Sequence, residues 1–247
     1  MGHIDHGKST LLDAIRKTNV VDSEAGGITQ HMSAYEVVHE TENGEKKKIT
    51  FLDTPGHAAF SAMRSRGATV ADIAVLVISA EEGVKPQTLE ALQAIADAKL
   101  PYVVAMTKID RPNANVERVK QELGTHNIFI EGYGGNVPCV AVSGKTGEGI
   151  SDLLEMLLLL AELGALTAEI EVPARGIVIE TSRDSRRGTT ATLIIQNGTL
   201  HRGDVVLMDG ALTVVRTLED ERGSAIREAT VSAPVRISGC ASEPQVG

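Results

Sequence analysis

The length, composition and charge of this chain exclude several classes of protein. It has 247 residues, 42% of them apolar, which is enough for one or two domains with packed cores. The 24 basic and 33 acidic side chains give a net charge of −9, which argues against broad electrostatic binding of nucleic acid but allows local contact. Aromatic residues make up only 2%, so stacking platforms for single-stranded nucleic acid are not expected.

The cysteines and the apolar runs indicate a chain of the reducing cytosol. Cys139 and Cys240 lie far apart and fit neither a disulfide nor a zinc pattern, so both are predicted to be small buried apolar residues. The longest leucine run is short and is flanked by Glu155 and Glu162, so no membrane span is predicted. No signal peptide is visible from Met1 onward.

The first two thirds of the chain alternate short apolar runs with helical stretches, which predicts an α/β domain with a mostly parallel sheet and helices on both faces. A Gly-containing loop, Asn19–Ser33, precedes a hairpin that turns at Asn43-Gly44. The predicted strands are Tyr35–His39, Lys48–Leu52, Ile73–Ile78, Tyr102–Met106 and Pro138–Val142, and the predicted helices are Ser9–Lys17, Pro86–Ala98, Val116–Leu123 and Ile150–Leu163.

The composition changes after Leu166, and no helix is predicted from Pro173 onward. Short strands separated by glycine turns are expected there at Arg175–Thr181, Thr189–Gln196, Asp204–Leu207, Thr213–Leu218 and Val235–Ser238. This spacing is typical of a small β-barrel. We therefore expect a nucleotide-binding domain at residues 1–166, a linker at 167–172 and a barrel domain, complete or incomplete, at 173–247.

Residues 2–9 read Gly-His-Ile-Asp-His-Gly-Lys-Ser and fit the phosphate-loop pattern G-x-x-x-x-G-K-[ST]. Gly2 and Gly7 allow backbone N–H groups to curl around phosphates, Lys8 supplies positive charge, and the Ser9 hydroxyl can ligate Mg²⁺. The amino terminus of the following helix adds positive potential. Because such a pattern also occurs in ordinary glycine-rich turns, nucleotide binding needs further support.

Two further segments are expected at the phosphate end of the site. Asp53-Thr54-Pro55-Gly56 follows a predicted strand, where the carboxylate can hold Mg²⁺ directly or through water and the Gly56 N–H can approach a γ-phosphate. Thr29, in a loop containing Gly26 and Gly27, is a candidate second hydroxyl on Mg²⁺, in a loop that orders with GTP and relaxes on hydrolysis. The alternatives are an Asp-capped turn and a flexible glycine loop.

Two other segments are expected to recognise the base. Asp110, in Thr107-Lys108-Ile109-Asp110, can accept hydrogen bonds from guanine N1 and N2, a pair of donors that adenine lacks, while the Lys108 stem covers the purine. Ser143-Gly144-Lys145 follows the next strand and offers N–H groups to guanine O6. Taken alone, the segment with Lys108 and Asp110 would indicate a surface ion pair, and the segment at Ser143 would indicate an ordinary loop. Ligands bind at the carboxyl edge of open parallel sheets, so the motifs together predict a GTP site with Mg²⁺.

Taken together, these residues resemble the translational GTPases and, more narrowly, bacterial or organellar translation initiation factor two. The phosphate loop is close to that family's Gly-His-Val-Asp-His-Gly-Lys-Thr, and residues 26–31 and 53–60 are similar to its other signatures. The similarity continues through residues 173–176 and 196–200 and so covers essentially the whole chain. It implies a monomeric GTP phosphohydrolase of the bacterial cytoplasm or an organellar matrix, which binds both ribosomal subunits and switches when the ribosome stimulates hydrolysis.

The resemblance also assigns roles to single residues. His57 would be the catalytic histidine that orients water, with a surface-loop histidine as the alternative. Ile4 and Ile28 would form an apolar gate, and Asp5 would lie near the phosphates with a monovalent cation as an optional ligand. Lys8 would act in catalysis together with His57. The metal would be held by Ser9, Thr29 and Asp53. The nucleotide would be bound by Asp5, His6, Gly7, Lys8, Ser9, Thr10, Gly56, Thr107, Lys108, Asp110, Ser143, Gly144 and Lys145.

The chain departs from the family pattern in several places. Thr107 replaces the usual Asn, and its hydroxyl reaches less far, so guanine selection is expected to rest on Asp110. Gly144 replaces Ala and keeps the N–H donor. The strand that should lead into Gly2, in the centre of the implied sheet, is absent. The later domains, including the one that binds initiator tRNA, are absent after Gly247, so no binding of initiator tRNA is expected.

Other functions stay open on the sequence alone. The alternatives are an elongation factor or a selenocysteine-specific factor, although residues 26–31 fit an initiation factor better, and a non-catalytic guanine-nucleotide-binding fragment. Arg183, Arg186 and Arg187 form a candidate contact with ribosomal RNA phosphates or a solvated hairpin tip. Because the motifs contain no arginine, slow intrinsic hydrolysis and stimulation by a partner are expected.

Overall fold

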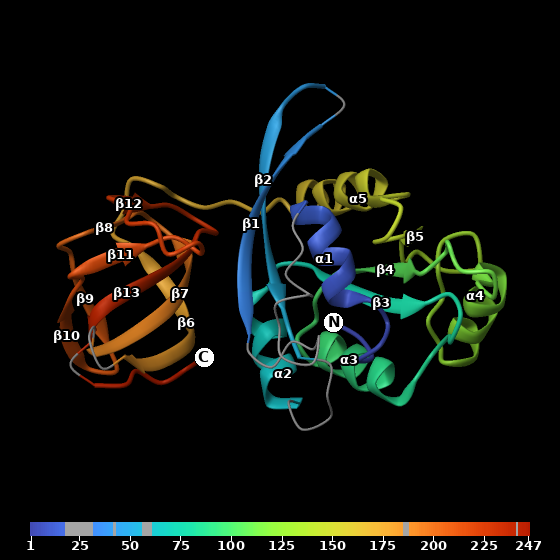
Figure 1. The fold of residues 1–247 in the computed structure, drawn as a ribbon, viewed down its shortest axis with the longest axis horizontal. Coiled ribbons are helices and arrows are strands. Elements are labelled where there is room, and N and C mark those ends of the chain that lie inside the picture. Colours follow the sequence, from blue (N-terminus) through green and yellow to red (C-terminus); the bar gives the residue numbers. More distant parts are fainter. Residues whose placement is uncertain (18–31, 42, 56–60, 185–187, 241) are drawn as a thin grey trace. The chain divides into compact units, whose positions relative to one another are not determined.

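A computed structural model of the chain provides the fold. It describes residues 1–17, 32–41, 43–55, 61–184, 188–240 and 242–247. The chain divides into two compact units, one formed by Met1–Met32 with Asp53–Ala165 and the other by Ser33–Leu52 with Leu166–Gly247 (Figure 1).

A parallel sheet of three strands, in the order β3-β4-β5, forms the centre of the first unit. The strands are β3 (Ala74–Ser79), β4 (Tyr102–Thr107) and β5 (Cys139–Ala141). β3 and β4 are apolar and almost entirely buried, as expected for strands covered on both faces. Their register pairs Ser79 with Thr107, so the polar ends of both strands lie side by side at the carboxyl edge.

Among the described residues, five helices accompany this sheet, with α1 and α5 on one side and α2 and α3 on the other (Figure 1). Pro86 begins α3 as predicted, since its fixed φ suits a first helical turn. Within the described residues, no helix has the length and apolar character needed to cross a membrane. The helices are α1 (Lys8–Arg16), α2 (Ser61–Val70), α3 (Pro86–Asp97), α4 (Val116–Thr125) and α5 (Ile150–Leu163).

The chain start pairs with the edge of β3 that faces away from β4. The Met1 amino group donates to the Val75 carbonyl at 2.8 Å, and the Val77 N–H donates to the Met1 carbonyl at 2.8 Å. Gly2 pairs with Val77 in parallel, and a Cβ at Gly2 would lie 2.4 Å from the Val77 oxygen. Only glycine allows this approach.

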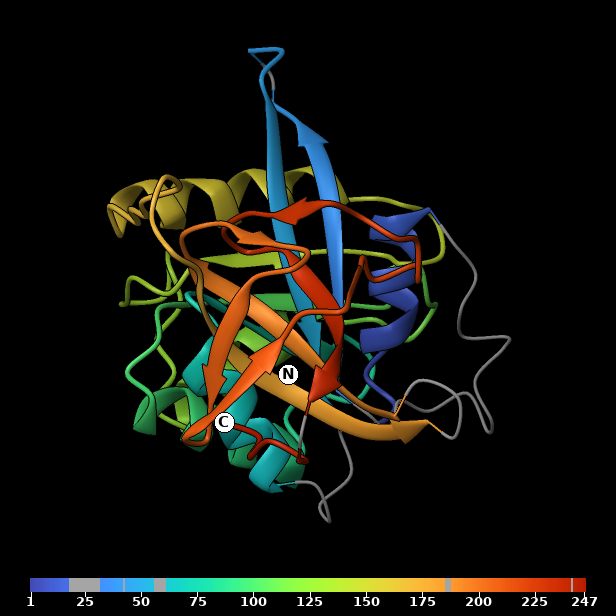
Figure 2. The same cartoon turned by 90° about the vertical axis from the view of Figure 1, so that its left-hand side faces the viewer.

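The second unit is built mainly of antiparallel strands around an aliphatic core, which confirms the β-barrel fold class (Figure 2). A four-stranded sheet has the order β11-β13-β7-β6, and the pairs β9-β10 and β8-β12 belong to the same unit. The strands are β6 (Arg175–Asp184), β7 (Gly188–Asn197), β8 (Leu200–His201), β9 (Val205–Met208), β10 (Ala211–Val214), β11 (Thr217–Glu219), β12 (Glu228–Ala229) and β13 (Pro234–Cys240).

The predicted hairpin is present as β1 (Ser33–Glu40) and β2 (Lys46–Asp53). Gly44 has φ 78°, and its N–H donates to the Thr41 carbonyl at 2.8 Å, which closes the turn. The Thr50 hydroxyl donates to the Ser232 carbonyl at 2.7 Å, so the hairpin contacts the barrel strands of its own unit. The domain limits at residues 166 and 173 stay a proposal.

Some elements differ from the sequence-based expectation. α2 is not predicted, because Gly67 weakens its helical pattern. Gly67 nevertheless allows α2 to pack closely, because a Cβ at this position would lie only 2.7 Å from Cγ2 of Thr54. The expected strand Thr213–Leu218 is split, because the Val215 N–H bonds to Asp204 whereas the Arg216 N–H bonds to Ser238. β8 and β12 have two residues each, too few to show a periodic pattern.

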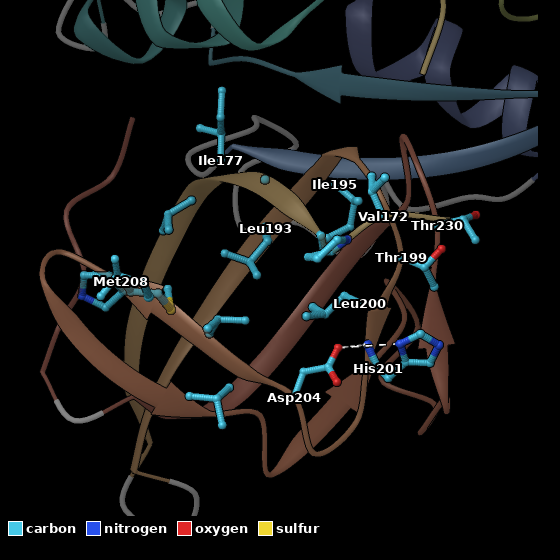
Figure 3. A pocket seen from close by; sticks show the side chains of 18 of the residues that line it. Val172, Ile177, Leu193, Ile195, Thr199, Leu200, His201, Asp204, Met208 and Thr230 are labelled. Carbon is cyan, nitrogen blue, oxygen red and sulfur yellow. Dashed lines mark hydrogen bonds and ion pairs between the residues drawn. The ribbon is translucent and has the colours of Figure 1, made fainter. Parts of the chain in front are cut away.

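The second unit contains a cavity of about 1050 Å³ (Figure 3). Apolar side chains such as Leu193, Ile195 and Leu200 line it, together with polar residues. In Figure 3 His201 and Asp204 lie close together, and the His201 N–H donates to Oδ2 of Asp204 at 2.7 Å. All lining residues belong to the second unit, so the cavity is not part of the site predicted at the strand ends of the first unit.

Candidate nucleotide-binding site

The phosphate loop lies at the amino terminus of α1. Gly7 precedes the helix with φ 80° and ψ 26°, a left-handed conformation that favours glycine. The Ile4 N–H donates to Oε1 of Gln87 at 3.0 Å, which fastens the loop to α3. The first N–H groups of a helix have no partner within the helix and attract anions. The loop therefore leads into the end of a helix that attracts anions.

Lys8 is buried within this loop rather than extended into water. Its side chain is 6% exposed, and Nζ donates to the His3 carbonyl at 2.7 Å. Burial lowers the pKa of Lys8 to about 8, with Arg64 acting in the same direction and Asp53 and Asp5 opposing. A bound phosphate would raise this pKa again, because a nearby negative charge favours the ammonium form.

His6 contributes to the loop mainly through its backbone. Its ring is fully buried, with Nδ1 3.3 Å from the Val77 carbonyl, to which it donates when Nδ1 carries the proton. Burial lowers the pKa of His6 to about 4, so the ring is neutral at pH 7. The ring packs edge-on against His3 with 4.9 Å between centroids, and the His6 carbonyl accepts a hydrogen bond from Thr107.

The base-recognition segment begins where β4 ends. Lys108 has a left-handed φ of 61°, which turns the chain away from the strand, and its Nζ lies 3.4 Å from Oε1 of Glu82. Asp110 is exposed, and its Oδ1 accepts a hydrogen bond from the Ser143 hydroxyl at 2.7 Å. This bond holds the pKa of the Asp110 carboxyl below its usual value. Asp110 is therefore ionised at neutral pH, and it is exposed to solvent.

The third strand-end segment contacts both Asp110 and α1. The Ser143 oxygen accepts from the N–H groups of Lys145 and Thr146 at 3.2 and 3.1 Å. A Cβ at Gly144 would lie 2.9 Å from the Thr10 carbonyl, so glycine suits the position where the family usually has Ala. The sequence predicts backbone donors in this segment, but it does not predict the hydrogen bond from the Ser143 hydroxyl to Asp110. The signal that could have indicated this bond is a serine directly after one strand and an aspartate after the neighbouring strand, at the same edge of the sheet.

The predicted metal residues Ser9 and Asp53 provide a hydroxyl and a carboxylate. Asp53 is 6% exposed at the end of β2, and it lies near enough to Lys8 to affect its pKa. Next to it, Thr54 is 2% exposed, and its Oγ1 has no hydrogen-bond partner among the described residues. An unpaired buried hydroxyl costs about 1–3 kcal/mol, so a polar ligand nearby would stabilise it. Mg²⁺ usually binds oxygen ligands, with one or two carboxylates from the protein and the rest from phosphates and water. The Asp53 carboxylate and the Ser9 hydroxyl are oxygen ligands of this kind.

Several predicted residues lie outside the described part of the chain. These are Ile28, Thr29, Gly56 and His57 of the site, and Arg186 and Arg187 of the candidate RNA contact. The described gate residue Ile4 is half-buried, and Asp5 is exposed at the surface of the loop. The roles assigned to all these residues stay predictions.

The burial of Arg64 next to the candidate site is not revealed by the sequence. Arg64 is 1% exposed, its Nη2 lies 2.5 Å from Oε2 of Glu90, and its Nη1 donates to the Pro55 carbonyl at 3.4 Å. It thus joins α2 to α3 and to the turn after Asp53. No sequence signal marks it, because an arginine between small residues normally indicates an exposed face.

Comparison with known proteins identifies both parts of the chain. Residues 1–162 match the family described as Elongation factor Tu GTP binding domain, and residues 173–247 match Elongation factor G domain 2. Proteins called translation initiation factor IF-2 are 53% identical in Pelotomaculum thermopropionicum and in Rubrobacter xylanophilus and 51% identical in Bacillus pumilus, in each case over 247 residues and 100% of this chain. The chain spans only 25%, 35% and 34% of those proteins, respectively.

Two solved structures are similar to this chain. GDP-bound aIF5B from Aeropyrum pernix has a TM-score of 0.70 and 33% identity, over 96% of this chain and 50% of that chain. A bacterial selenocysteine-specific elongation factor EF-Sec has a TM-score of 0.73 over 100% of this chain and 41% of that chain, but its 24% identity supports the fold alone. The chain belongs to the translational GTPases, with an Elongation factor Tu-type GTP-binding domain followed by a β-barrel domain, and resembles translation initiation factor IF-2 throughout.

Proposed function

We propose that this chain is the nucleotide switch of a translation initiation factor, which binds GTP and hydrolyses it when the ribosome stimulates it. The observation that carries the proposal is the set of contacts among the strand-end loops. The Thr107 hydroxyl bonds to the phosphate loop at 2.5 Å, and the Ser143 hydroxyl bonds to Asp110 at 2.7 Å. These contacts support the proposal, because they bring the candidate phosphate-binding and base-binding segments to one edge of one sheet, where ligands bind in open α/β folds.

The proposed binding steps follow from charge and hydrogen bonding. The α1 amino terminus and Lys8 hold the phosphates, since both present positive charge inside the loop. Asp110 accepts from guanine N1 and N2, and Ser143, Gly144 and Lys145 offer N–H groups to O6. A bound adenine would leave the Asp110 carboxylate without its donors, so the site favours guanine.

The proposed cofactor is Mg²⁺, held by Ser9 and Asp53, with Thr29 as a further ligand. Bound Mg²⁺ would neutralise negative charge on the phosphates. A monovalent cation beside Asp5 is part of the same proposal. Ser9 begins α1 next to Lys8, so its position is fixed by the helix, and Asp53 is fixed by burial at the end of β2.

The proposed hydrolytic residues are His57 and Lys8. His57 would orient the attacking water, and Ile4 and Ile28 would exclude other water from it, while Lys8 holds the phosphates in place. Positioning and electrostatic stabilisation are the main contributions that a protein makes to phosphoryl transfer. Both ribosomal subunits are the proposed partners, with the bacterial cytoplasm, or alternatively an organellar matrix, as the proposed location and a monomer as the proposed state.

A non-catalytic nucleotide-binding role is the second candidate. Among the described strands, β2, which carries Asp53, pairs with β1 and not with the central sheet. A site whose metal ligand lies on a strand outside the central sheet could bind GDP without hydrolysing GTP. An elongation or selenocysteine-specific factor is a third candidate, which the identity to initiation factors disfavours.

Single-turnover hydrolysis of GTP, with and without ribosomes, tests the proposal. A switch should hydrolyse GTP slowly alone and at least about tenfold faster with ribosomes, because a partner must complete the site. Tight GDP binding with no hydrolysis under either condition would favour the non-catalytic role. Binding of neither nucleotide would contradict both.

A further inference from the structure

The buried side of α2 is built from small residues and one arginine. Four of the described residues of this helix are buried, namely Arg64, Gly67, Ala68 and Val70. Arg64 lies three and four positions before Gly67 and Ala68, so these three residues share one face of the helix. Small side chains bury little apolar surface, so apolar packing attaches this face only weakly. The attachment of α2 therefore depends largely on the polar contacts of Arg64.

Arg64 connects three parts of the first unit. Its Nη2 lies 2.5 Å from Oε2 of Glu90 on α3, and its Nη1 donates to the Pro55 carbonyl at 3.4 Å. The arginine side chain is 2% exposed, whereas that of Glu90 is 46% exposed. A buried guanidinium needs a partner charge and acceptors for its hydrogens, because an unpaired charge away from water is costly. The pair with Glu90 thus keeps Arg64 in a position from which it reaches the turn at Pro55.

That turn begins at the predicted metal ligand Asp53. Asp53 is 6% exposed and Thr54 is 2% exposed, so both side chains are held inside the protein. α2 also packs against Thr54, since a Cβ at Gly67 would lie 2.7 Å from its Cγ2. Burial lowers the pKa of Lys8 to about 8, Asp53 opposes this shift and Arg64 adds to it, so both residues lie near the phosphate loop. The backbone after Asp53 is therefore fixed by α2, through packing and through the hydrogen bond from Arg64.

We propose that Arg64, held by Glu90, is a positioning residue that fixes the turn after β2 and with it the Asp53 carboxylate. The inference rests on the proposed function, in which Asp53 holds Mg²⁺. Arg64 touches neither the metal nor the nucleotide in this role, because its guanidinium is buried and bonded to Glu90 and Pro55. Losing either member of the pair should therefore weaken the contribution of Mg²⁺ to nucleotide binding. The choice between bases should stay constant, because Asp110 follows a different strand.

The first test is the ratio of GDP affinity in Mg²⁺ to GDP affinity in EDTA, measured by calorimetric titration. R64M keeps an unbranched apolar stem and removes the guanidinium, and E90L removes the partner carboxylate. Each should lower the ratio about tenfold, as expected for groups that orient a metal ligand, and change the affinity in EDTA less than about threefold. The preference for GDP over ADP should not change. R66M on α2 and D97L on α3 are the matched controls.

The double variant R64M/E90L shows whether the two residues act as one unit. It should lose no more than R64M alone, because both changes break the same ion pair. A loss equal to the product of the two single losses, about 100-fold, would contradict the pairing. A fall in GDP affinity of the same size with Mg²⁺ and with EDTA would overturn the positioning role, because it would mean that Arg64 supports the whole site rather than the metal ligand.

Amide hydrogen exchange of the nucleotide-free protein gives a second readout that needs no ligand. Exchange at residues 53–54 and 61–70 should rise at least about tenfold in R64M and E90L and stay unchanged in both controls, because the turn and α2 lose their shared contact. E90L changes a half-exposed side chain and decides the outcome if R64M does not fold. Unchanged exchange at both segments in folded E90L would overturn the proposal. If the unaltered chain binds no nucleotide, the proposed function fails, while the exchange result still decides the role of Arg64.

Discussion

The phosphate half and the base half of the candidate site are built in opposite ways. At the phosphate half, Lys8 and His6 are buried, and burial lowers both of their pKa values. At the base half, Asp110 is exposed, and a single hydrogen bond from Ser143 lowers its pKa. The phosphate half therefore consists of buried ionisable groups. The base half consists of an exposed hydrogen-bond acceptor whose position is fixed by a neighbouring side chain.

This difference suggests a division of labour. Buried positive charge interacts strongly with phosphates, because little solvent screens it, so the phosphate half should supply most of the affinity. The exposed carboxylate is well solvated, so it adds less affinity but discriminates between bases by which donors it meets. Substitutions in the two halves should therefore have distinguishable effects.

The largest effect is expected for hydrolysis in H57A. If His57 orients water at the phosphate half, ribosome-stimulated single-turnover hydrolysis should fall on the order of 10²-fold or more. GDP affinity should be unchanged, because His57 is not expected to contact the diphosphate. H126A, in the loop after α4, is the matched control. Stimulated turnover that stays normal in H57A would remove His57 from the mechanism.

The next effect is expected for affinity in K8A. Removing the buried ammonium should weaken GDP about 100-fold, close to 3 kcal/mol, as for truncation of one partner of a buried charged pair. Calorimetric titration measures it. K47A, on the exposed part of β2, should bind like the unaltered chain. A loss below about threefold in K8A would contradict the assignment of most affinity to the phosphate half.

A smaller loss accompanied by a change of specificity is expected for D110N. The amide offers a donor where guanine requires an acceptor, so GDP should weaken about thirtyfold, or about 2 kcal/mol. Xanthosine diphosphate, which carries an oxygen at C2, should gain affinity. Competition titration of both nucleotides tests this, with D97N on α3 as the control. A parallel loss of both nucleotides would mean that Asp110 supports the fold rather than selects the base.

The smallest expected effect concerns stability against pH. The pKa of His6 is about 4 in the folded chain against an ordinary value of 6.5, so the unfolded chain binds the proton more tightly. This contribution to stability is complete above pH 6.5 and is lost as the pH falls toward 4. At pH 5 it should lower the free energy of unfolding by about 2 kcal/mol relative to pH 8. Urea denaturation of the unaltered chain and of H6Q at both pH values measures it, and an equal decline in both variants would contradict the assignment to His6.

The sequence predicts the elements of the first unit well, because each has a strong local signal. Pro86 marks the start of α3, and the apolar runs of β3 and β4 mark strands covered on both faces. It does not predict α2, β8 or β12, nor the division into β10 and β11. Those features depend on packing and on changes of hydrogen-bond partner, such as those at Val215 and Arg216, which leave no local pattern.

The site shows the same limit. The motifs predict Lys8, Asp53 and Asp110 as site residues, because these residues hold fixed positions within the motifs. They do not reveal that Thr107 donates to His6, that the Ser143 side chain holds Asp110, or that Arg64 is buried against Glu90. These contacts join residues between 26 and 101 positions apart in the chain, and single-sequence patterns contain no distances over such separations.

Titration of the nucleotide-free chain with GDP and ADP, with Mg²⁺ and with EDTA, is the most direct test of a guanine-nucleotide site at the strand ends. The account predicts micromolar or tighter binding of GDP that weakens without Mg²⁺, and ADP binding weaker by at least about 100-fold. Equal affinities for GDP and ADP, or no binding of either, would contradict it.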